Sequence, residues 1–175
     1  NDRWSYRELL PYLRRIESDP EFPGDFHGTD GPVPVRRWKR AELVGDQRAF
    51  LDGARRLGYA SCPDANDPES SGVGPVPMNN RDGIRWSTAI TYLAPARHRL
   101  NLTVKADCLV HRIVFDGRRA TGVLVESGGQ LFEAQGTEII LAAGAIGSPH
   151  ILLVSGVGPA GQIERAGVPV VADLP

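Results

Sequence analysis

The sequence predicts a mixed fold of the α+β / α/β class, in which part of a parallel sheet joins an antiparallel β-meander and a set of helical and loop segments. Three observations predict this fold. Helix patterns in the first half alternate with long loops rich in proline and glycine. Between residues 109 and 134, apolar and polar side chains alternate on either side of turn dipeptides. The run Glu138–Ala143 is apolar almost throughout, which is typical of a strand buried on both faces of a parallel sheet.

The first predicted helix begins at a capping box over Ser5–Glu8, in which the serine hydroxyl and the glutamate carboxylate each accept from the other residue's backbone amide. Apolar residues recur at helical spacing as far as Ile16. Pro11 falls inside this helix and is expected to remove one hydrogen bond and to bend the first turns. The loop that follows, residues 19–40, is predicted to hold at most a short strand near Val33–Arg36.

A second helix is predicted over Ala41–Leu57, followed by Gly58 at the position where glycine commonly ends a helix. A second long loop over residues 61–77 is expected to carry function or to cover another domain. Ser87 is predicted to cap a short third helix that Pro95 ends. The apolar face of the second helix is predicted to consist of Leu43, Phe50, Ala54 and Leu57.

The middle of the chain is predicted to form β-strands. Turn dipeptides at Asp116-Gly117 and Gly128-Gly129 separate the later ones, and this order predicts an antiparallel meander. The side chains of Val110, Arg112 and Val114 alternate as expected for a strand with one buried face. The four predicted strands are Leu102–Ala106, Leu109–Phe115, Thr121–Glu126 and Gln130–Ala134.

A strand, a turn of small residues and a helix follow one another after the meander. The strand is Glu138–Ala142, and Ser148-Pro149 is predicted to begin the helix, with the hydroxyl as cap and proline at the first helical position. Gly156 is predicted to end this helix. A short helix near Gly161–Arg165 and a strand over Val168–Val171 complete the predicted elements.

The turn between Ala142 and Ser148 is the most informative stretch about function. Small side chains there let a ligand approach the backbone, and the unpaired amides of the following helix favour an anion. Dinucleotides bind at this place in α/β sheets, at the carboxyl ends of the strands. A tight turn that needs small residues only for packing is the alternative, and these residues alone leave both interpretations open.

The charge balance gives no electrostatic attraction to nucleic acid or to an anionic membrane. Lysine plus arginine number 20 and aspartate plus glutamate number 21, so that the net charge is -1. No apolar run approaches the roughly 18 residues that a membrane helix needs. The short basic run of Arg36, Arg37, Lys39 and Arg40 is predicted to lie on a solvated loop or helix entry.

Cys62 and Cys108 are the two cysteines, and their spacing matches neither a disulfide framework nor a metal motif. A reducing compartment is the simpler interpretation, and we expect a cytoplasmic location of bacterial type. Cys108 lies in an apolar run and is expected to be buried, whereas Cys62 lies in a polar loop and is expected to be exposed. The chain begins at Asn1 and ends after a strand-like run, so we expect an internal piece of a longer protein.

The residues Gly144-Ala145-x-x-Ser148-Pro149, followed after five residues by Ser155-Gly156-Val157-Gly158, resemble the second signature of the glucose–methanol–choline (GMC) flavoprotein family. The length and spacing of this match are specific. Further segments resemble the family in the same order, so that the resemblance covers nearly the whole chain. These segments include Trp4-Ser5-Tyr6, Gly83-x-Arg85-x-Ser87, Asn101–Val104 and Val168–Val171.

The resemblance implies a fragment of an FAD-dependent oxidoreductase of the choline dehydrogenase or alcohol oxidase type, which acts on CH–OH groups. Residues 98–175 would belong to the FAD-binding domain, with a Rossmann-like sheet and the meander, and residues 1–97 mostly to the substrate-side domain. Hydride would pass from a small-molecule alcohol to flavin N5. An FAD-containing hydroxynitrile lyase of the same family and a non-catalytic truncated module are the alternatives. The electron acceptor and the oligomeric state stay open.

The resemblance also places particular residues at the cofactor. The backbone of Val110 would lie beside the adenine ring, unless Val110 is simply an inward-facing residue of the meander. Ala142, Ala143 and Gly144 would pass the adenosine and pyrophosphate half of FAD, where a larger side chain would clash. Ser148 belongs to the same set, with a local capping role as the favoured one.

No catalytic residue is expected in this chain. The catalytic histidine of the family belongs to a carboxy-terminal part, and the family's amino-terminal Gly-x-Gly-x-x-Gly turn is also missing, so the chain alone is expected to bind little or no FAD. Met78 and Asn79 are the predicted wall of the substrate cavity, and no metal site is expected. The four histidines, none of which matches the catalytic position, are His27, His98, His111 and His150.

Overall fold

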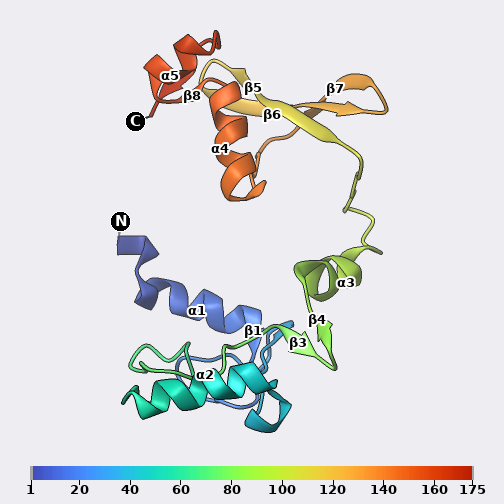
Figure 1. The fold of residues 1–175 in the computed structure, drawn as a ribbon. Helices are drawn as coiled ribbons and strands as arrows, with labels where there is room; N and C mark the ends of the chain where they lie inside the picture. Colours follow the sequence, from blue (N-terminus) through green and yellow to red (C-terminus); the bar gives the residue numbers. More distant parts are fainter. Residues whose placement is uncertain (1, 175) are drawn as a thin grey trace. The chain divides into compact units, whose positions relative to one another are not determined.

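The computed structural model describes residues 2–174. These residues form two compact units that divide between Leu102 and Thr103 (Figure 1). We refer to the residues up to Leu102 as unit 1 and to those from Thr103 onward as unit 2. Within the described part of the chain, no helix is both long enough and apolar enough to cross a bilayer.

Unit 1 consists of short helices and two-residue strands joined by long loops. Its helices are η1 (Asp2–Trp4), α1 (Tyr6–Ile16), η2 (Arg40–Glu42), α2 (Gly45–Arg56), η3 (Ala89–Leu93) and α3 (Ala94–Ala96), and its strands are β1 (Glu17–Ser18), β2 (Val33–Pro34), β3 (Asn80–Arg81) and β4 (Ile84–Arg85). β1 and β2 are parallel, and β3 and β4 are antiparallel. The buried apolar side chains of this unit are Val33, Val35, Leu51 and Cys62.

Helix α1 has the predicted start and length. The Ser5 hydroxyl accepts from the amide of Glu8 at 3.4 Å, which is the serine half of the predicted capping box. Pro11 lies inside the helix as predicted. At Glu17 the backbone becomes extended, which ends the helix and begins β1.

Helix α2 differs from the prediction at its start and on its apolar face. It begins at Gly45 rather than near Ala41, because the extended backbone of Leu43 and Val44 separates it from the 3-10 helix η2. Leu51 is its buried residue, whereas Phe50 is 70% exposed. The predicted apolar face is therefore wrong at Phe50 and Leu57, which are exposed, whereas Leu43 and Ala54 are half-buried.

The third predicted helix starts one residue later and runs further than expected. Its N-cap is Thr88, and Ser87 contributes its carbonyl, which accepts from the amides of Ile90 and Thr91. Pro95 does not end the helix. The π-helical turn η3 leads into α3, where Pro95 occupies one of the first positions and its missing N–H is tolerated.

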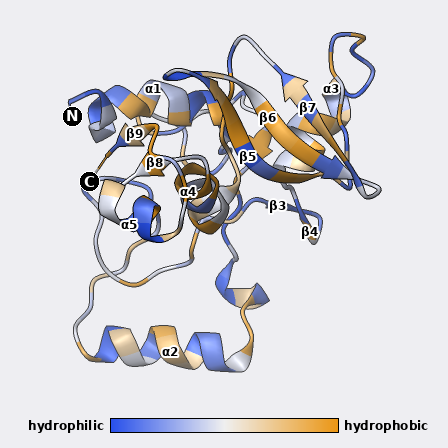
Figure 2. Cartoon of the chain, turned by 90° about the horizontal axis from the view of Figure 1, so that it is seen from above, coloured by the Kyte–Doolittle hydropathy of each residue, from blue (hydrophilic) through white to orange (hydrophobic). Residues whose placement is uncertain are grey.

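Unit 2 contains the predicted antiparallel meander, whose three strands pair in sequence order. Its strands are β5 (Leu109–Asp116), β6 (Arg119–Ser127), β7 (Gln130–Gln135), β8 (Val157–Gly158) and β9 (Ala172–Asp173), and its helices are α4 (Gly144–Val154) and α5 (Ala160–Arg165). Apolar residues concentrate on β5 and β6 (Figure 2), and α4 contacts β5. The buried apolar side chains are Ile113, Val125 and Ile163. The last strand lies at Ala172–Asp173, just after the predicted Val168–Val171, and pairs in parallel with β8.

Two predicted strands, Leu102–Ala106 and Glu138–Ala142, are not strands in the structure. A strand of a parallel sheet requires hydrogen-bonded neighbours, and no described segment pairs with either run. Their apolar side chains are correspondingly exposed, with Val104 at 50% and Ile140 at 80%. Exposed apolar runs of this kind are suited to burial by further elements of a sheet.

The predictions for the two cysteines are wrong. Cys62 is buried, because the loop over residues 61–77 folds back on itself through the bridge between Ser61 and Val73. Its sulfur lies 3.0 Å from the hydroxyl oxygen of Ser70. Cys108 is only partly buried, because the strand predicted before it does not form. Both cysteines are free thiols in the structure.

The Ser155 hydroxyl ties α4 to the outer edge of the meander. It accepts from the amide of Ile113 in β5 at 2.8 Å and donates to the carbonyl of Ile151 in α4 at 2.5 Å. Both Ser155 and Ile113 are buried. The serine of the Ser155–Gly158 segment therefore has a structural role, because it satisfies a strand amide that has no strand beside it.

We expect Ser155→Ala to lower the stability of unit 2 by about 1–3 kcal/mol, the usual effect of leaving a buried amide without its acceptor. Hydrogen–deuterium exchange should rise in peptides from β5 and α4, measured in the whole protein that carries this chain. Ser127→Ala, at the end of β6, is the matched control and should leave exchange unchanged. Equal exchange in the two variants would contradict this role of Ser155.

Candidate functional site

Helix α4 begins at a different residue from the one that the sequence predicted. The helix starts at Gly144 rather than at Ser148, so that Pro149 lies inside it and not at its first position. Gly144 has a φ of +83°, a left-handed conformation that a side chain would strain. The Ser148 hydroxyl accepts from the amide of Ala143 at 2.9 Å. Ser148 therefore holds the turn locally, in agreement with its favoured role.

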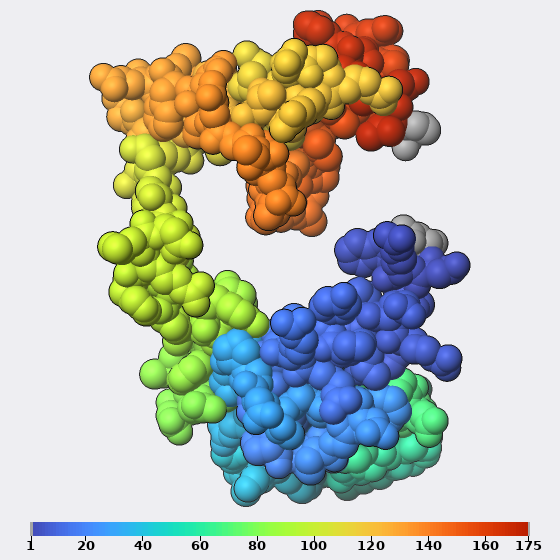
Figure 3. All heavy atoms as spheres, turned by 180° about the vertical axis from the view of Figure 1, so that it is seen from behind, coloured from blue at the N-terminus to red at the C-terminus, as the bar shows by residue number. Residues whose placement is uncertain are grey.

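The residues of this turn have small side chains or none, and no other segment of unit 2 covers them. Ala142, Ala143 and Gly144 are exposed, and a methyl group built on Gly144 would meet no described atom within 4 Å. The outer end of α4 stands clear of the other atoms of unit 2 in the space-filling view (Figure 3). No acidic residue lies in the first turn of the helix. The unpaired amides at this end are therefore open to an anionic group, with no carboxylate to repel it.

Val110 lies in β5, which is an edge strand of the meander. It is partly buried and pairs with Val125 of β6. The register shifts between Val110 and Arg112, which indicates a β-bulge at His111. The His111 ring lies 2.8 Å from the Glu126 carboxylate on the neighbouring strand. A contact of Val110 with a nucleotide stays a prediction.

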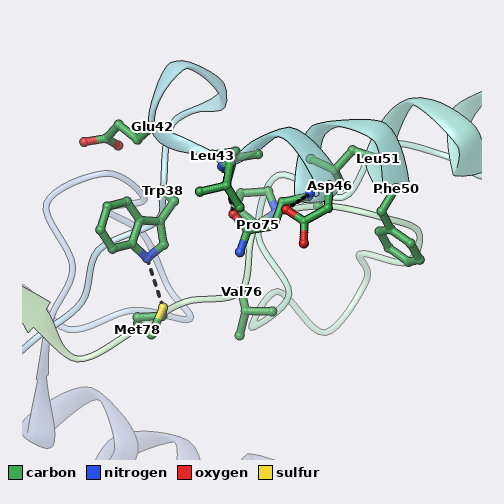
Figure 4. Close-up of a pocket in the computed structure, with 12 residues that line it drawn as sticks. Trp38, Glu42, Leu43, Asp46, Phe50, Leu51, Pro75, Val76 and Met78 are labelled. Atoms are coloured by element: carbon green, nitrogen blue, oxygen red, sulfur yellow. Dashed lines mark hydrogen bonds between the residues drawn. The ribbon is translucent and has the colours of Figure 1, made fainter.

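A groove of about 710 Å³ lies in unit 1 between α2 and the segment after Gly74 (Figure 4). Met78 lines this groove, and its sulfur accepts from the Trp38 indole N–H at 3.1 Å. Asn79 does not line it, because its side-chain amide turns away to donate to the carbonyl of Pro34 at 3.4 Å. The groove wall is mainly apolar and includes Trp38, Leu43, Phe50, Leu51, Val76 and Met78.

Unit 1 contains a group of buried charged side chains that no sequence pattern predicts. Asp19, His27, Arg37 and Asp64 are each at most 5% exposed, and Glu17 completes the group. We call these five residues the His27 cluster. The prediction of a solvated basic run is wrong for Arg37, because its charge is paired in the interior instead.

Arg37 and His27 each bridge carboxylates within the His27 cluster. Arg37 Nη1 donates to Asp19 Oδ2 at 2.7 Å, and Nη2 donates to Asp64 Oδ1. His27 Nε2 lies 2.7 Å from Asp64 Oδ2, and its Nδ1 lies 3.0 Å from Glu17 Oε1. The cluster therefore joins the end of α1, the loop over residues 19–40 and the loop over residues 61–77.

The electrostatics of the cluster keep Asp64 ionised. Burial alone would raise the pKa of the Asp64 carboxyl, but hydrogen bonds from the Asn66 amide, Arg37 and His27 together outweigh burial and lower the pKa below its ordinary value. Among residues 2–174, no group of three or more histidine, cysteine or acidic side chains is arranged to hold a metal ion. The cluster is therefore a network of ion pairs.

A family model described as GMC oxidoreductase matches residues 1–173 of the chain. A GMC-type oxidoreductase of Rhodococcus erythropolis is 46% identical over 170 residues, which cover 97% of this chain and 34% of that protein. An oxygen-dependent choline dehydrogenase of Photobacterium profundum is 39% identical over 173 residues, which cover 98% of this chain and 30% of that protein. The chain thus spans about a third of the length of these relatives.

The fold of this chain is also found in a solved structure. Pyridoxine 4-oxidase from Mesorbium loti superposes with a TM-score of 0.91 at 34% sequence identity. The match covers 100% of this chain and 34% of the oxidase. The arrangement of helices, loops and meander described above therefore occurs within a longer protein.

Proposed function

Because the chain belongs to the GMC oxidoreductase family, we propose that the whole protein carrying it oxidises a small-molecule alcohol at a CH–OH group. FAD is the cofactor of this family. When bound, FAD supplies the hydride acceptor, and the protein supplies orientation and electrostatics. The relatives named for choline and pyridoxine support an alcohol as the substrate class.

This proposal rests on one observation: the residues of the turn over Ala142–Gly144 have small side chains or none, and they are exposed. Its exposed backbone and the free amides of α4 fit the adenosine and pyrophosphate half of FAD. We propose that these residues and Ser148 bind the cofactor, with Ser148 acting by holding the Ala143 amide in place. Val110 lies in the edge strand β5, and no described strand pairs with the outer edge of β5, which supports a similar contact there.

We propose that the groove lined by Met78 belongs to the substrate side of the protein. Its mainly apolar wall suits the carbon skeleton of an alcohol. Asn79 supports this wall through its hydrogen bond to Pro34 rather than by reaching a substrate. The base that removes the hydroxyl proton would come from a part of the protein outside residues 1–175.

Purification of the whole protein tests the proposed function. We expect a yellow protein with a flavin absorption spectrum, which primary or secondary alcohols bleach when oxygen is excluded. A colourless protein would contradict the cofactor proposal. A yellow protein that no alcohol bleaches, but that cleaves cyanohydrins, would contradict alcohol oxidation and identify a lyase instead.

We also propose a cytoplasmic location for the protein. Both cysteines of the chain are free thiols, and free thiols persist in reducing compartments. Fractionation of cells that produce the tagged protein tests this location, because the protein should appear with a cytoplasmic marker enzyme.

A further inference from the structure

Helix α1 has an apolar face that no described segment of unit 1 covers. Its members recur at spacings of three and four residues, which places them on one side of the helix. We call this side the α1 stripe, and it consists of Tyr6, Leu9, Leu13 and Ile16. Three of these side chains are 43–47% exposed, and no residue of α1 is buried.

The carboxy-terminal end of α1 is held in place although the α1 stripe is bare. The Arg14 side chain donates to the His27 carbonyl at 3.1 Å, and the Gly31 amide donates to the Glu17 carbonyl at 2.9 Å. These bonds fix the loop over residues 19–40 against the end of the helix. The first turns of α1 project from the rest of unit 1 (Figure 3). The helix is therefore anchored at one end, and its apolar side is left open.

Helix α1 needs a packing partner because it is too short to be stable without one. Isolated helices of fewer than about 12–15 residues are marginal in water, and α1 has 11 residues, with Pro11 among them. Most of the stability of a helix in a folded protein comes from burial of its apolar face. The residues that bury the α1 stripe must therefore come from outside unit 1.

We propose that, in the whole protein, the α1 stripe packs against an apolar surface formed by a segment of the same polypeptide outside residues 1–175. The chain spans about a third of the length of its relatives, so about two thirds of such a protein can supply this surface. A segment of the same polypeptide also loses less translational and rotational freedom on packing than a separate molecule does, which favours it as the occupant.

A second copy of the chain and a membrane are less suitable occupants. Four side chains on one helix are few compared with the roughly 20–30 residues that each partner contributes to a standard interface. An anionic membrane attracts proteins with an excess of basic residues, whereas this chain has a net charge of -1. The observations therefore favour an interface within one polypeptide.

Cysteine labelling of the whole protein tests the proposal. We expect a maleimide to label Leu13→Cys at least about tenfold more slowly than Arg15→Cys, with each rate divided by the rate in denatured protein. Leu13 faces the proposed partner, and Arg15 lies on the opposite side of the helix. Both side chains are exposed in unit 1, so similar labelling rates would overturn the proposal. Mass spectrometry of the α1 peptide detects the label at the introduced thiol alone.

Dilution and lipid distinguish the three occupants. Slow labelling of Leu13→Cys that is independent of protein concentration and needs no lipid supports the internal interface. Labelling that becomes faster on dilution indicates a second copy and overturns the proposal. Labelling that slows only after addition of phosphatidylglycerol vesicles indicates a membrane and also overturns it.

Photo-crosslinking identifies the covering segment without changing the α1 stripe. Tyr12 lies one turn before Ile16 at the border of the stripe and is 61% exposed, so Tyr12→p-benzoylphenylalanine should be tolerated. After irradiation, we expect a product of monomer size in which the crosslinked peptide lies outside residues 1–175. A crosslink to residues 1–175, or a product of dimer size, would contradict the proposal.

Hydrogen–deuterium exchange of the wild-type protein decides the question if Leu13→Cys does not fold. A covered α1 should exchange at least about tenfold more slowly than its intrinsic rate, because its hydrogen bonds open only when the interface opens. Exchange of the α1 peptide near the intrinsic rate would show a fraying, uncovered helix and would overturn the proposal.

Discussion

Gly28→Ala is expected to destabilise unit 1 by about 3 kcal/mol or more, because the new methyl group has no space. A carbon built on Gly28 would lie 1.7 Å from the carbonyl oxygen of Arg14 and 2.7 Å from that of Glu17. Both neighbours are backbone atoms that cannot rotate away. The Gly28 backbone also donates to the Glu17 side chain and accepts from the Asp19 amide, so a shift would break two hydrogen bonds.

Gly24→Ala in the same loop is the matched control for Gly28→Ala. A carbon built on Gly24 meets no described atom within 4 Å, so this variant should keep wild-type stability. The measurement is the thermal midpoint of the whole protein together with hydrogen exchange of peptides from residues 17–37. Similar midpoints and exchange in the two variants would mean that the α1 end and this loop are not packed as described.

Ala143→Asp is expected to weaken FAD binding by the whole protein about tenfold or more. The carboxylate would stand at the amino-terminal end of α4, where we propose that the pyrophosphate binds. A negative charge at this end of a helix is itself favourable by about 0.3–1 kcal/mol, so the helix should not lose stability. Loss of affinity without loss of folding therefore distinguishes this variant from one that merely disrupts the turn.

Ala143→Asn separates charge from size in this experiment. Asparagine has the shape of aspartate and is neutral, so its loss of FAD affinity measures the added size alone, and the further loss in Ala143→Asp measures the charge. Flavin fluorescence quenching by the protein stripped of its cofactor measures both affinities. Equal affinities for the two variants would place the pyrophosphate away from Ala143 and would contradict the proposed role of the turn.

Elements specified by neighbouring residues could be predicted from the sequence. The meander follows from Asp116-Gly117 and Gly128-Gly129, which set both hairpins through local geometry alone. The start of α1 follows from the hydroxyl of Ser5. Leu102–Ala106 and Glu138–Ala142 have equally suitable compositions but are not strands, because a parallel strand depends on partners distant in the sequence.

The small turn before α4 could be predicted, but the start of its helix could not. Ser148-Pro149 has the composition of a helix start, yet the Gly144 backbone turns four residues earlier and the Ser148 hydroxyl reaches back to Ala143. Of the two residues predicted for the substrate cavity, Met78 lines the groove of unit 1 and Asn79 does not, and their contact with a substrate stays a prediction. Adjacent residues of an extended segment point to opposite sides, and composition does not specify which side faces inward.

The His27 cluster had no signal in the sequence because its members follow no motif spacing. They come from the end of one helix and from two loops, and only the fold brings them together. The length of those loops was the available indication, since a long ordered loop needs internal contacts to hold it. Arg37 shows the limit of a composition argument, because it is buried while Lys39 and Arg40 of the same basic run are exposed.

The sequential order of β5, β6 and β7 also has a consequence for synthesis on the ribosome. Each strand pairs with the one made just before it, so the meander can form within microseconds of emerging, without any later residue. The two apolar runs that flank it, Leu102–Ala106 and Glu138–Ala142, pair with no described segment, so their apolar side chains are exposed when the meander forms. The nascent protein therefore carries a folded three-stranded sheet between two exposed apolar segments. A chaperone would be needed at those two segments, because exposed apolar segments aggregate.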